Sequence, residues 1–465
     1  MVRAVDELWR HRIIAELGRG YDFSHDLLRD TAYAQVSPPR RWLLHRRVAQ
    51  GLELLHAGNT DPVAPQLAEQ YARAGGHAKA VTYYQRAAQV AAGRFAHAEA
   101  VRLYRKALSI LAGTPEGRDR DSQELAILHG MAAPLNAMEG YASPALQQDL
   151  ERSVALAESL GRKDLLLASL AGLWSSRFVQ GRTADSHRLA VRTLALAGQG
   201  SGFEGQAHFG VGGSALSMGR PAEGLRHLKL AATLGGGMNL LTVGTRSDVH
   251  AMAFAAHASW LLGQDDAALD ACQGAIGLAR RIGEPYSLAV ALAYGGVTHQ
   301  MRGDLPALRD AVAELSELCG RYEFAYYREW ALILGGWSAA DGSGARLAAR
   351  GIGHLKRNGS FARMPYWLSL LADLTARDGE DRAAAARAIL DAALTAGRVH
   401  QDAWWLPEVM RMRARYDGDA AAARLQSAAE LAAAHGSVAL LRRCEDDLRR
   451  RGVPVPSGPG VPAAG

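Results

Sequence analysis

Apolar residues recur with helical spacing along almost the whole chain beyond residue 60, in segments rich in alanine and leucine. This periodicity predicts helices, and the alternation typical of strands occurs convincingly nowhere except around residues 21–23. Pairs of apolar stretches are separated by a glycine that we interpret as the turn between two helices. These turn glycines are Gly75, Gly181, Gly219, Gly263, Gly303, Gly342, Gly379 and Gly418.

The spacing of these glycines is nearly constant. From Gly181 onward the successive steps are 38, 44, 40, 39, 37 and 39 residues. A repeat of this length is typical of helix–turn–helix units that stack into an α-solenoid. The sequence therefore predicts an all-α superhelix built from serial helix pairs.

Small residues occupy two positions around most of these glycines, which is what two closely crossing helices require. Five residues after the glycine stand Ala80, Ser186, Gly224, Ala268, Leu308, Leu347, Ala384 and Ala423. Seven residues before it stand Ala68, Trp174, Gly212, Ala256, Gly296, Gly335, Ala372 and Arg411. We expect the helices of each pair to cross at these positions.

The first unit resembles the tetratricopeptide consensus. It carries Leu67, Ala68, Tyr71, Gly75, Ala80, Tyr84 and Ala87 at the consensus spacing. The resemblance implies tetratricopeptide-like repeats over residues 61–112 and a tetratricopeptide-like superhelix over residues 124–451. We expect a polar linker at 113–123, a charged capping helix at 438–451 and a disordered Pro/Gly-rich tail at 452–465.

The first sixty residues have a different pattern. Residues 5–17 read as an amphipathic helix, followed by a short turn or strand. Ser24 is placed to cap the next helix, and Pro38 stands at the start of the one after it.

The string FSHDLLRDTAY at residues 23–33 and the following LHRRVA resemble one known junction. It joins the winged-helix segment to the repeats of STAND-class ATPase regulators, which include the bacterial transcriptional activator domain proteins and the large ATP-binding LuxR-type regulators. The resemblance implies a winged-helix remnant over residues 1–60. A complete member has a phosphate-binding loop, but no Gly-Lys dipeptide occurs here. A LuxR-type member ends in a DNA-reading helix-turn-helix, whereas this chain ends in its Pro/Gly-rich tail. We therefore expect the repeat portion of such a regulator, without the ATPase and DNA-binding domains.

Charge and composition narrow the function classes. The chain has 53 lysines and arginines and 47 acidic residues, and both kinds are mixed along the predicted helices. This pattern argues against direct nucleic-acid binding. No apolar run approaches ~18 residues, so we expect no membrane span, and no signal peptide is recognisable. The three cysteines are far apart and form no CxxC pair. We expect reduced thiols in a cytoplasmic protein.

Candidate catalytic and cofactor motifs occur in the sequence, but the residues around them do not have the pattern that such sites require. Residues 200–205 fit GxGxxG and 210–215 fit a looser form, but helical patterns surround both where a dinucleotide site needs a strand. Among the sixteen histidines, His250 and His257 share a helix face without an evident third metal ligand. We expect no cofactor, no metal and no catalytic residues.

The concave face of such a superhelix is lined by the first helix of each pair. The side chains 13, 10, 6 and 3 residues before each turn glycine are expected on that face. The adjacent Trp404 and Trp405 cannot both lie on one buried stripe of a helix. The resulting candidate groove, aromatic and polar, consists of Phe178, Gln206, Phe209, His250, His257, Trp260, Gln300, Glu329, Tyr366, Asp373, Trp405 and Glu408.

A groove of this composition suits a protein or peptide partner, or a small inducer. We therefore expect a non-catalytic protein-interaction and effector-sensing arm of a bacterial transcriptional regulator. Two alternatives stay open: a free-standing scaffold that bridges protein partners, and an enzyme with an unrecognised helical active site.

Overall fold

The computed structural model describes residues 2–18, 20–198, 200–235, 246–339, 342–377 and 379–454. From residue 455 onward, the expected disordered tail lies outside the described residues. The chain divides into two compact units, residues 1–93 with 102–116 and residues 94–101 with 117–465.

The first unit begins with α1 (Val2–Arg10), the strands β1 (Ile14–Leu17) and β2 (Gly20–Phe23), and α2 (Asp26–Gln35). It continues with α3 (Pro38–Leu55), the 3-10 turn η1 (Asp61–Val63), α4 (Ala64–Arg73), α5 (His77–Gly93) and part of α6 (His97–Ala112).

The helix expected at residues 5–17 is only partly present. α1 ends at Arg10, and Arg12 takes a positive φ of 54° that a right-handed helix does not allow. Residues 14–17 form β1 instead and pair antiparallel with β2, with Ile14 opposite Phe23. The strand expected around residues 21–23 is confirmed.

Ser24 does not cap α2, contrary to the expectation. Its Oγ donates to the carbonyl oxygen of Ile13 at 3.0 Å, which ties the end of the hairpin to its start. His25 takes the N-cap position without a side-chain hydrogen bond. The winged-helix origin of this segment stays a prediction.

The first predicted pair is confirmed as α4 and α5, joined at Gly75 with a φ of +71°. Its consensus residues Leu67, Tyr71 and Ala80 are buried. The hydroxyl of Tyr71 donates to the Glu53 carboxylate of α3 at 2.7 Å. A third helix is therefore fastened to the pair.

The second unit continues the pairing. Its pairs are α7 (Arg118–Glu139) with α8 (Pro144–Leu160), α9 (Lys163–Val179) with α10 (Thr183–Ala197), α11 (Glu204–Ser217) with α12 (Pro221–Thr233), α13 (Ser247–Leu261) with α14 (Asp265–Ile282), α15 (Pro285–Arg302) with α16 (Leu305–Tyr322), α17 (Ala325–Ser338) with α18 (Gly344–Arg357), α19 (Met364–Arg377) with α20 (Ala383–His400), and α21 (Leu406–Arg413) with α22 (Ala421–Ala434). The 3-10 turns η2 (Glu380–Arg382), η3 (Ala414–Tyr416) and η4 (Gly418–Ala420) lie within the last two pairs, and α23 (Val438–Arg450) follows.

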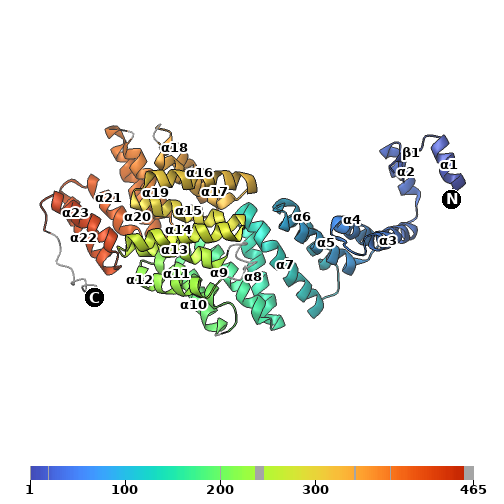
Figure 1. Cartoon of the computed structure of the whole chain (residues 1–465), viewed down its shortest axis with the longest axis horizontal. Helices are drawn as coiled ribbons and strands as arrows, with labels where there is room; N and C mark the ends of the chain where they lie inside the picture. The colour runs from blue at the N-terminus through green and yellow to red at the C-terminus, as the bar shows by residue number, and fades with distance from the viewer. Residues whose placement is uncertain are drawn as a thin grey trace. The chain divides into compact units, whose positions relative to one another are not determined.

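Figure 1 shows the helices of the second unit stacked in sequence order. The odd-numbered helices from α7 to α23 are called inner here, because most of them are buried on nearly all sides, as in α13. The even-numbered, outer helices bury one stripe, as α14 does with Ala268, Cys272, Ala275 and Ala279. The architecture is an all-α, tetratricopeptide-like superhelix.

All eight predicted turn glycines lie between paired helices, and all have positive φ, from 52° at Gly418 to 135° at Gly379. This conformation is easy for glycine and costly for other residues. The period therefore reflects a repeated backbone requirement.

The expected close crossing is clearest between α11 and α12. A Cβ added to Gly212 would lie 2.9 Å from the carbonyl oxygen of Gly224. In the last three pairs the crossing register is displaced. The expected Leu347, Ala384 and Ala423 are not buried there, and Ala348, Ala386 and Leu425 are buried instead. The turns in these three pairs are longer, and two of them contain 3-10 segments. The outer helix of each pair therefore begins later after the inner helix, which shifts the residues at the crossing.

This displacement supplies a matched pair of variants. Ala268→Leu should cost about 1–3 kcal/mol of folding free energy, because Ala268 is fully buried where α13 and α14 cross. Ala384→Leu occupies the same nominal register but is exposed, so it should change stability by less than about 0.5 kcal/mol. Urea unfolding followed by tryptophan fluorescence measures both. Equal midpoints would contradict the assigned crossing.

The predicted linker is shorter than expected. α7 begins at Arg118, so the second half of residues 113–123 is helical. Asp119 and Asp121 lie in its first turn, where acidic side chains interact favourably with the helix dipole.

A feature that the repeat pattern did not predict joins helices five pairs apart. The carbonyl oxygen of Val179, at the end of α9, accepts from the backbone N–H of Phe361, just before α19, at 2.8 Å. The Ser217 carbonyl at the end of α11 accepts from the N–H of Ala403, before α21, at 2.7 Å. We call this line of contacts the seam.

The seam continues at both ends with the same offset. Tyr141, which follows α7, packs against Tyr326 of α17 with ring centroids 5.5 Å apart. The Leu261 carbonyl at the end of α13 accepts from Ser437 Oγ, before α23, at 3.5 Å. The last carbonyls of a helix have no partner within that helix. Here the next superhelical turn satisfies several of them, so the superhelix closes on itself.

Candidate functional site

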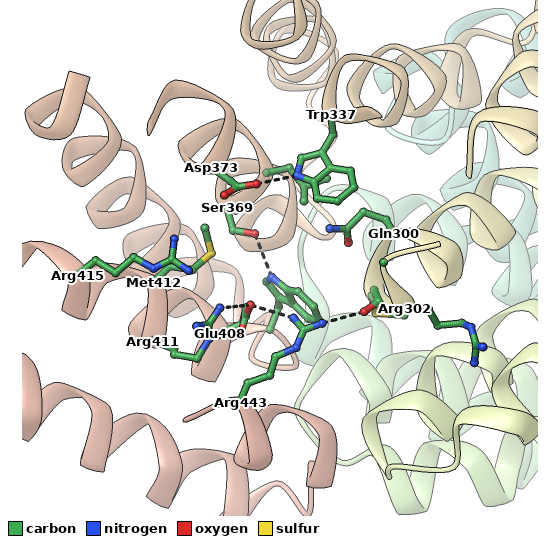
Figure 2. A pocket seen from close by; sticks show the side chains of 14 residues that line it. Gln300, Arg302, Trp337, Ser369, Asp373, Glu408, Arg411, Met412, Arg415 and Arg443 are labelled. Carbon is green, nitrogen blue, oxygen red and sulfur yellow. Dashed lines mark hydrogen bonds and ion pairs between the residues drawn. The ribbon is translucent and has the colours of Figure 1, made fainter. Parts of the chain in front are cut away.

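A cavity of about 280 Å³ lies where five inner helices converge on the interior of the second unit (Figure 2). We call it the arginine pocket. Its walls come from the end of α15 and from α17, α19, α21, η3 and α23. It is lined by Gln300, Met301, Arg302, Gly303, Trp337, Ser369, Leu370, Asp373, Trp405, Glu408, Arg411, Met412, Arg415 and Arg443.

Helical spacing places several of these side chains on one wall. Trp405, Glu408, Met412 and Arg415 are separated by three, four and three residues, so successive turns present them on the same side. On α19, Ser369 and Asp373 are four residues apart and share a face for the same reason.

A buried ion network forms the floor of the pocket. The Glu408 carboxylate accepts two hydrogen bonds of 2.8 Å from Arg411 and one of 2.9 Å from Arg443 of α23. Arg411 also donates to Asp447 at 2.6 Å, and Arg443 to the carbonyl oxygen of Met301 at 2.8 Å. The network joins α15, α21 and α23, as Figure 2 shows for its central residues.

This network keeps Glu408 ionised. Burial by itself would raise the pKa of Glu408, but the guanidinium groups of Arg411 and Arg443 outweigh it and lower the pKa to about 2. A carboxylate held in this way has no proton to donate near neutral pH and is a weak base. Its arrangement therefore supports structure rather than proton transfer.

Two tryptophans form the apolar side of the pocket. The indole N–H of Trp337 donates to Asp373 at 3.0 Å, and that of Trp405 donates to Ser369 Oγ at 3.0 Å. The polar edges of both rings are thus fixed, and both rings line the cavity; Figure 2 shows the bond between Trp337 and Asp373.

The structure also shows where metal-ligating side chains and thiols are placed. Within the described ranges, no group of three or more His, Cys, Asp or Glu side chains could hold a metal ion. Cys272, Cys319 and Cys444 are buried, and burial raises their thiol pKa values to about 11, 12 and 12. Thiols of high pKa are poor nucleophiles.

The structure brings four of the twelve predicted groove residues to this pocket: Gln300, Asp373, Trp405 and Glu408. Three others, Phe178, Phe209 and His250, line a separate aromatic chamber of about 20 Å³, which has room for about one water molecule. Gln206 lines a smaller void of about 10 Å³.

The remaining four residues, His257, Trp260, Glu329 and Tyr366, are buried in the interior. His257 and Tyr366 are fully buried, so a partner cannot reach them in this conformation. The expectation of an open groove along the whole concave face is therefore wrong, because the seam closes it and inner side chains fill it. Trp404 and Trp405 are likewise both buried.

Sequence reasoning missed Trp337, Arg415 and Arg443. Trp337 was missed because the turn after α17 is two residues longer than the turn after α13. Positions counted back from Gly342 are therefore displaced by two residues along α17. Arg415 lies in a 3-10 turn beyond the last turn of α21. Arg443 reaches the pocket only because α23 follows the seam.

A second missed feature is Arg363 in the interior. Arg363 is 2% exposed and has a strained backbone φ of +61°. Its guanidinium carbon lies 4.9–5.6 Å from the ring centres of Phe254, Tyr294, Trp330 and Trp404. Its backbone N–H donates to Asp402 at 2.6 Å. Burial raises the pKa of Asp402 to about 7, against the opposing pull of Arg363.

Buried histidines predict a loss of stability in acid. Burial lowers the pKa of His250 to about 3 and that of His257 well below its usual 6.5. The unfolded chain therefore binds these protons first, and their contribution to stability is complete above about pH 6.5 and declines as the pH falls. Asp402 acts in the opposite direction, because its raised pKa favours the folded state as the pH falls from about 7.

Eight further histidines have pKa values lowered by burial, so the loss in acid should exceed the gain from Asp402. They are His97, His129, His187, His208, His227, His299, His400 and His435. We expect the urea midpoint to fall between pH 7 and pH 5, and to fall less in His250→Phe. His25→Phe, at an exposed position, is the control. A midpoint that rises over this interval would contradict the prediction.

No protein-family model matches the chain. An uncharacterized protein of Rhizobium meliloti (strain 1021) is 24% identical over 452 residues, which is 94% of this chain and 44% of that protein. The chain thus spans less than half the length of this curated relative. No helix in the described part of the chain is long and apolar enough to cross a membrane.

Two solved structures are similar to the chain, and the first of them shares its fold. A Rap protein complexed with Competence and Sporulation Factor has a TM-score of 0.51 at 12% identity, over 80% of this chain and 99% of that one. A STAND protein with a tetratricopeptide repeat sensor, from Pyrococcus horikoshii, has a TM-score of 0.35 at 15% identity, over 76% of this chain and 57% of that one.

Proposed function

We propose that the chain is a non-catalytic, ligand-sensing and protein-interaction arm of a bacterial transcriptional regulator. The observation that carries this proposal is the arginine pocket, where side chains from five inner helices meet around one cavity. An occupant would contact consecutive pairs and α23 together. Its binding energy would then depend on how those pairs are oriented, which is how a ligand shifts the balance between conformations.

Two comparisons support the proposal. The Rap protein of similar fold is complexed with Competence and Sporulation Factor, so a superhelix of this kind is compatible with a bound factor. The matching part of the Rhizobium meliloti relative belongs to a longer polypeptide, in which further segments could receive the change in orientation. A cytoplasmic location and the absence of direct nucleic-acid binding stay predictions.

Selection from a random peptide display library on the full chain tests the proposal. The selected peptides should lose binding to Met412→Trp, which places a larger side chain in the pocket. They should keep binding to Arg387→Trp, which introduces the same residue on the exposed side of the outer helix α20. Peptides that bind both variants equally would contradict the pocket as the sensing site.

The scaffold alternative has one observation in its favour. In the first unit, Leu27 of α2 and Trp42, Leu54 and Leu55 of α3 are more than half exposed. Large apolar side chains exposed in number on two neighbouring segments of the chain are candidates for a protein contact. Selected peptides that bind Met412→Trp normally but fail with Trp42→Ser would favour the scaffold.

A further inference from the structure

The pocket carries a cation whose charge no neighbour balances. Arg411 and Arg443 share Glu408, and Arg411 also pairs with Asp447. Arg302 pairs with Asp265 on α14. Across the described residues, no ion pair or hydrogen bond joins the Arg415 guanidinium to another side chain, although Arg415 is exposed and lines the pocket.

The acidic groups of the pocket, in contrast, are already satisfied. Glu408 accepts three charge-assisted hydrogen bonds from two arginines. Asp373 accepts from the Trp337 indole and pairs with Arg377. A cationic ligand would have to compete with these bonds, whereas an anionic one meets an unpaired guanidinium.

The rest of the pocket suits a flat apolar group. Trp337 and Trp405 line it beside Leu370 and Met412. Figure 2 shows Arg415 beside Met412 on one side of the cavity, with Trp337 and Gln300 across from them. The volume of about 280 Å³ is near the lower end of the usual range for small-molecule pockets, roughly 300–1,000 Å³.

We propose that the arginine pocket binds a ligand in which an anionic group is joined to an aromatic or other flat apolar group. Arg415 pairs with the anion, and the apolar group packs against Trp337 and Trp405. This inference rests on the proposed function and adds the chemical class of the ligand. Two sources supply this chemistry: a free aromatic carboxylic acid, or the C-terminal residue of a peptide.

Isothermal titration calorimetry with matched probes on the full chain tests the charge preference. Indole-3-acetate and tryptamine share a ring and differ in the sign of their charge. N-acetyltryptophan and N-acetyltryptophanamide differ only in a free carboxylate and represent the end of a peptide. We expect each anionic probe to bind about tenfold or more tightly than its partner, because a charge-assisted hydrogen bond is worth about that factor. The tighter of the two anionic probes identifies the source.

The variant Arg415→Gln should weaken the binding of both anionic probes by about tenfold and leave the affinity of the other two probes unchanged. Arg398→Gln is the matched control, since Arg398 is also an exposed arginine, on the outer helix α20, with no ion pair among the described residues. Neither substitution removes a buried group, so both variants should fold.

The outcomes separate this inference from the proposed function. If tryptamine and the amide bind as tightly as the anions, or if Arg415→Gln changes nothing, or if no probe binds, the anionic class is wrong. The proposed function still stands in those cases provided that displayed peptides lose binding to Met412→Trp. It fails on its own account if those peptides bind that variant normally.

Discussion

Replacing Glu408 with leucine is expected to lower the free energy of unfolding of the second unit by about 3–5 kcal/mol, the usual cost of breaking a buried ion pair from one side. The substitution leaves the charges of Arg411 and Arg443 facing an apolar side chain. Arg411 then keeps only its bond to Asp447, and Arg443 only its bond to the Met301 carbonyl. Seven of the nine tryptophans lie in the second unit, so urea unfolding followed by tryptophan fluorescence reports mainly on it.

A control on the surface separates this network from ordinary ion pairs. Glu317 pairs with Arg321 on α16, and both side chains are more than half exposed. Glu317→Leu should therefore change stability by less than about 1 kcal/mol. The double variant Glu408→Leu with Arg443→Leu should recover part of the loss, because one of the uncompensated charges is gone. If Glu408→Leu unfolds at the wild-type midpoint, the network does not hold α15, α21 and α23 together.

Replacing Gly181 with alanine should destabilise the second unit by about 2–5 kcal/mol through the seam. An added Cβ would lie 2.7 Å from the His400 ring and 2.9 Å from the Phe361 Cβ, at a backbone φ of +75°. The positive φ alone costs alanine about 1–2 kcal/mol, and forcing apart a packed contact adds about 1–3 kcal/mol.

The same substitution at Gly303 measures the cost of the positive φ alone, so the difference between the two variants gives the cost of the packed contact. Gly303 occupies the same turn position in its pair with a φ of +77°, but an added Cβ would meet no atom within 4 Å. Gly303→Ala should therefore lose only about 1–2 kcal/mol. Equal losses in the two variants, measured by the same urea titrations, would mean that the seam contributes nothing at Gly181.

The pairing of helices was readable from the chain because its causes are local. A turn that returns one helix against the next needs a positive φ, and glycine adopts it at least cost. The same glycine therefore recurs at Gly181, Gly219 and Gly263, and the structure confirms each as a turn. Where the turns lengthen, as after α17, counting from Gly342 gave the wrong face and missed Trp337.

The candidate site was only partly predictable. Gln300 and Asp373 were found because they lie at fixed distances before a turn glycine on inner helices. Arg443 could not be found in this way, because its approach to Met301 joins residues 142 positions apart. Arg363 also gave no signal, since an arginine in a connecting segment normally points to water.

By itself the sequence determined the all-α class, the helix pairs and the turns between them, because apolar periodicity and glycine conformation act over a few residues. Only the tertiary structure decided that the superhelix closes after five pairs. Every residue carries a backbone carbonyl group and all but proline carry an N–H, so no side-chain pattern predicts which of these groups will meet at the seam. That closure buries most of the predicted concave face, and it brings α23 beside α15 and α21 to form the arginine pocket.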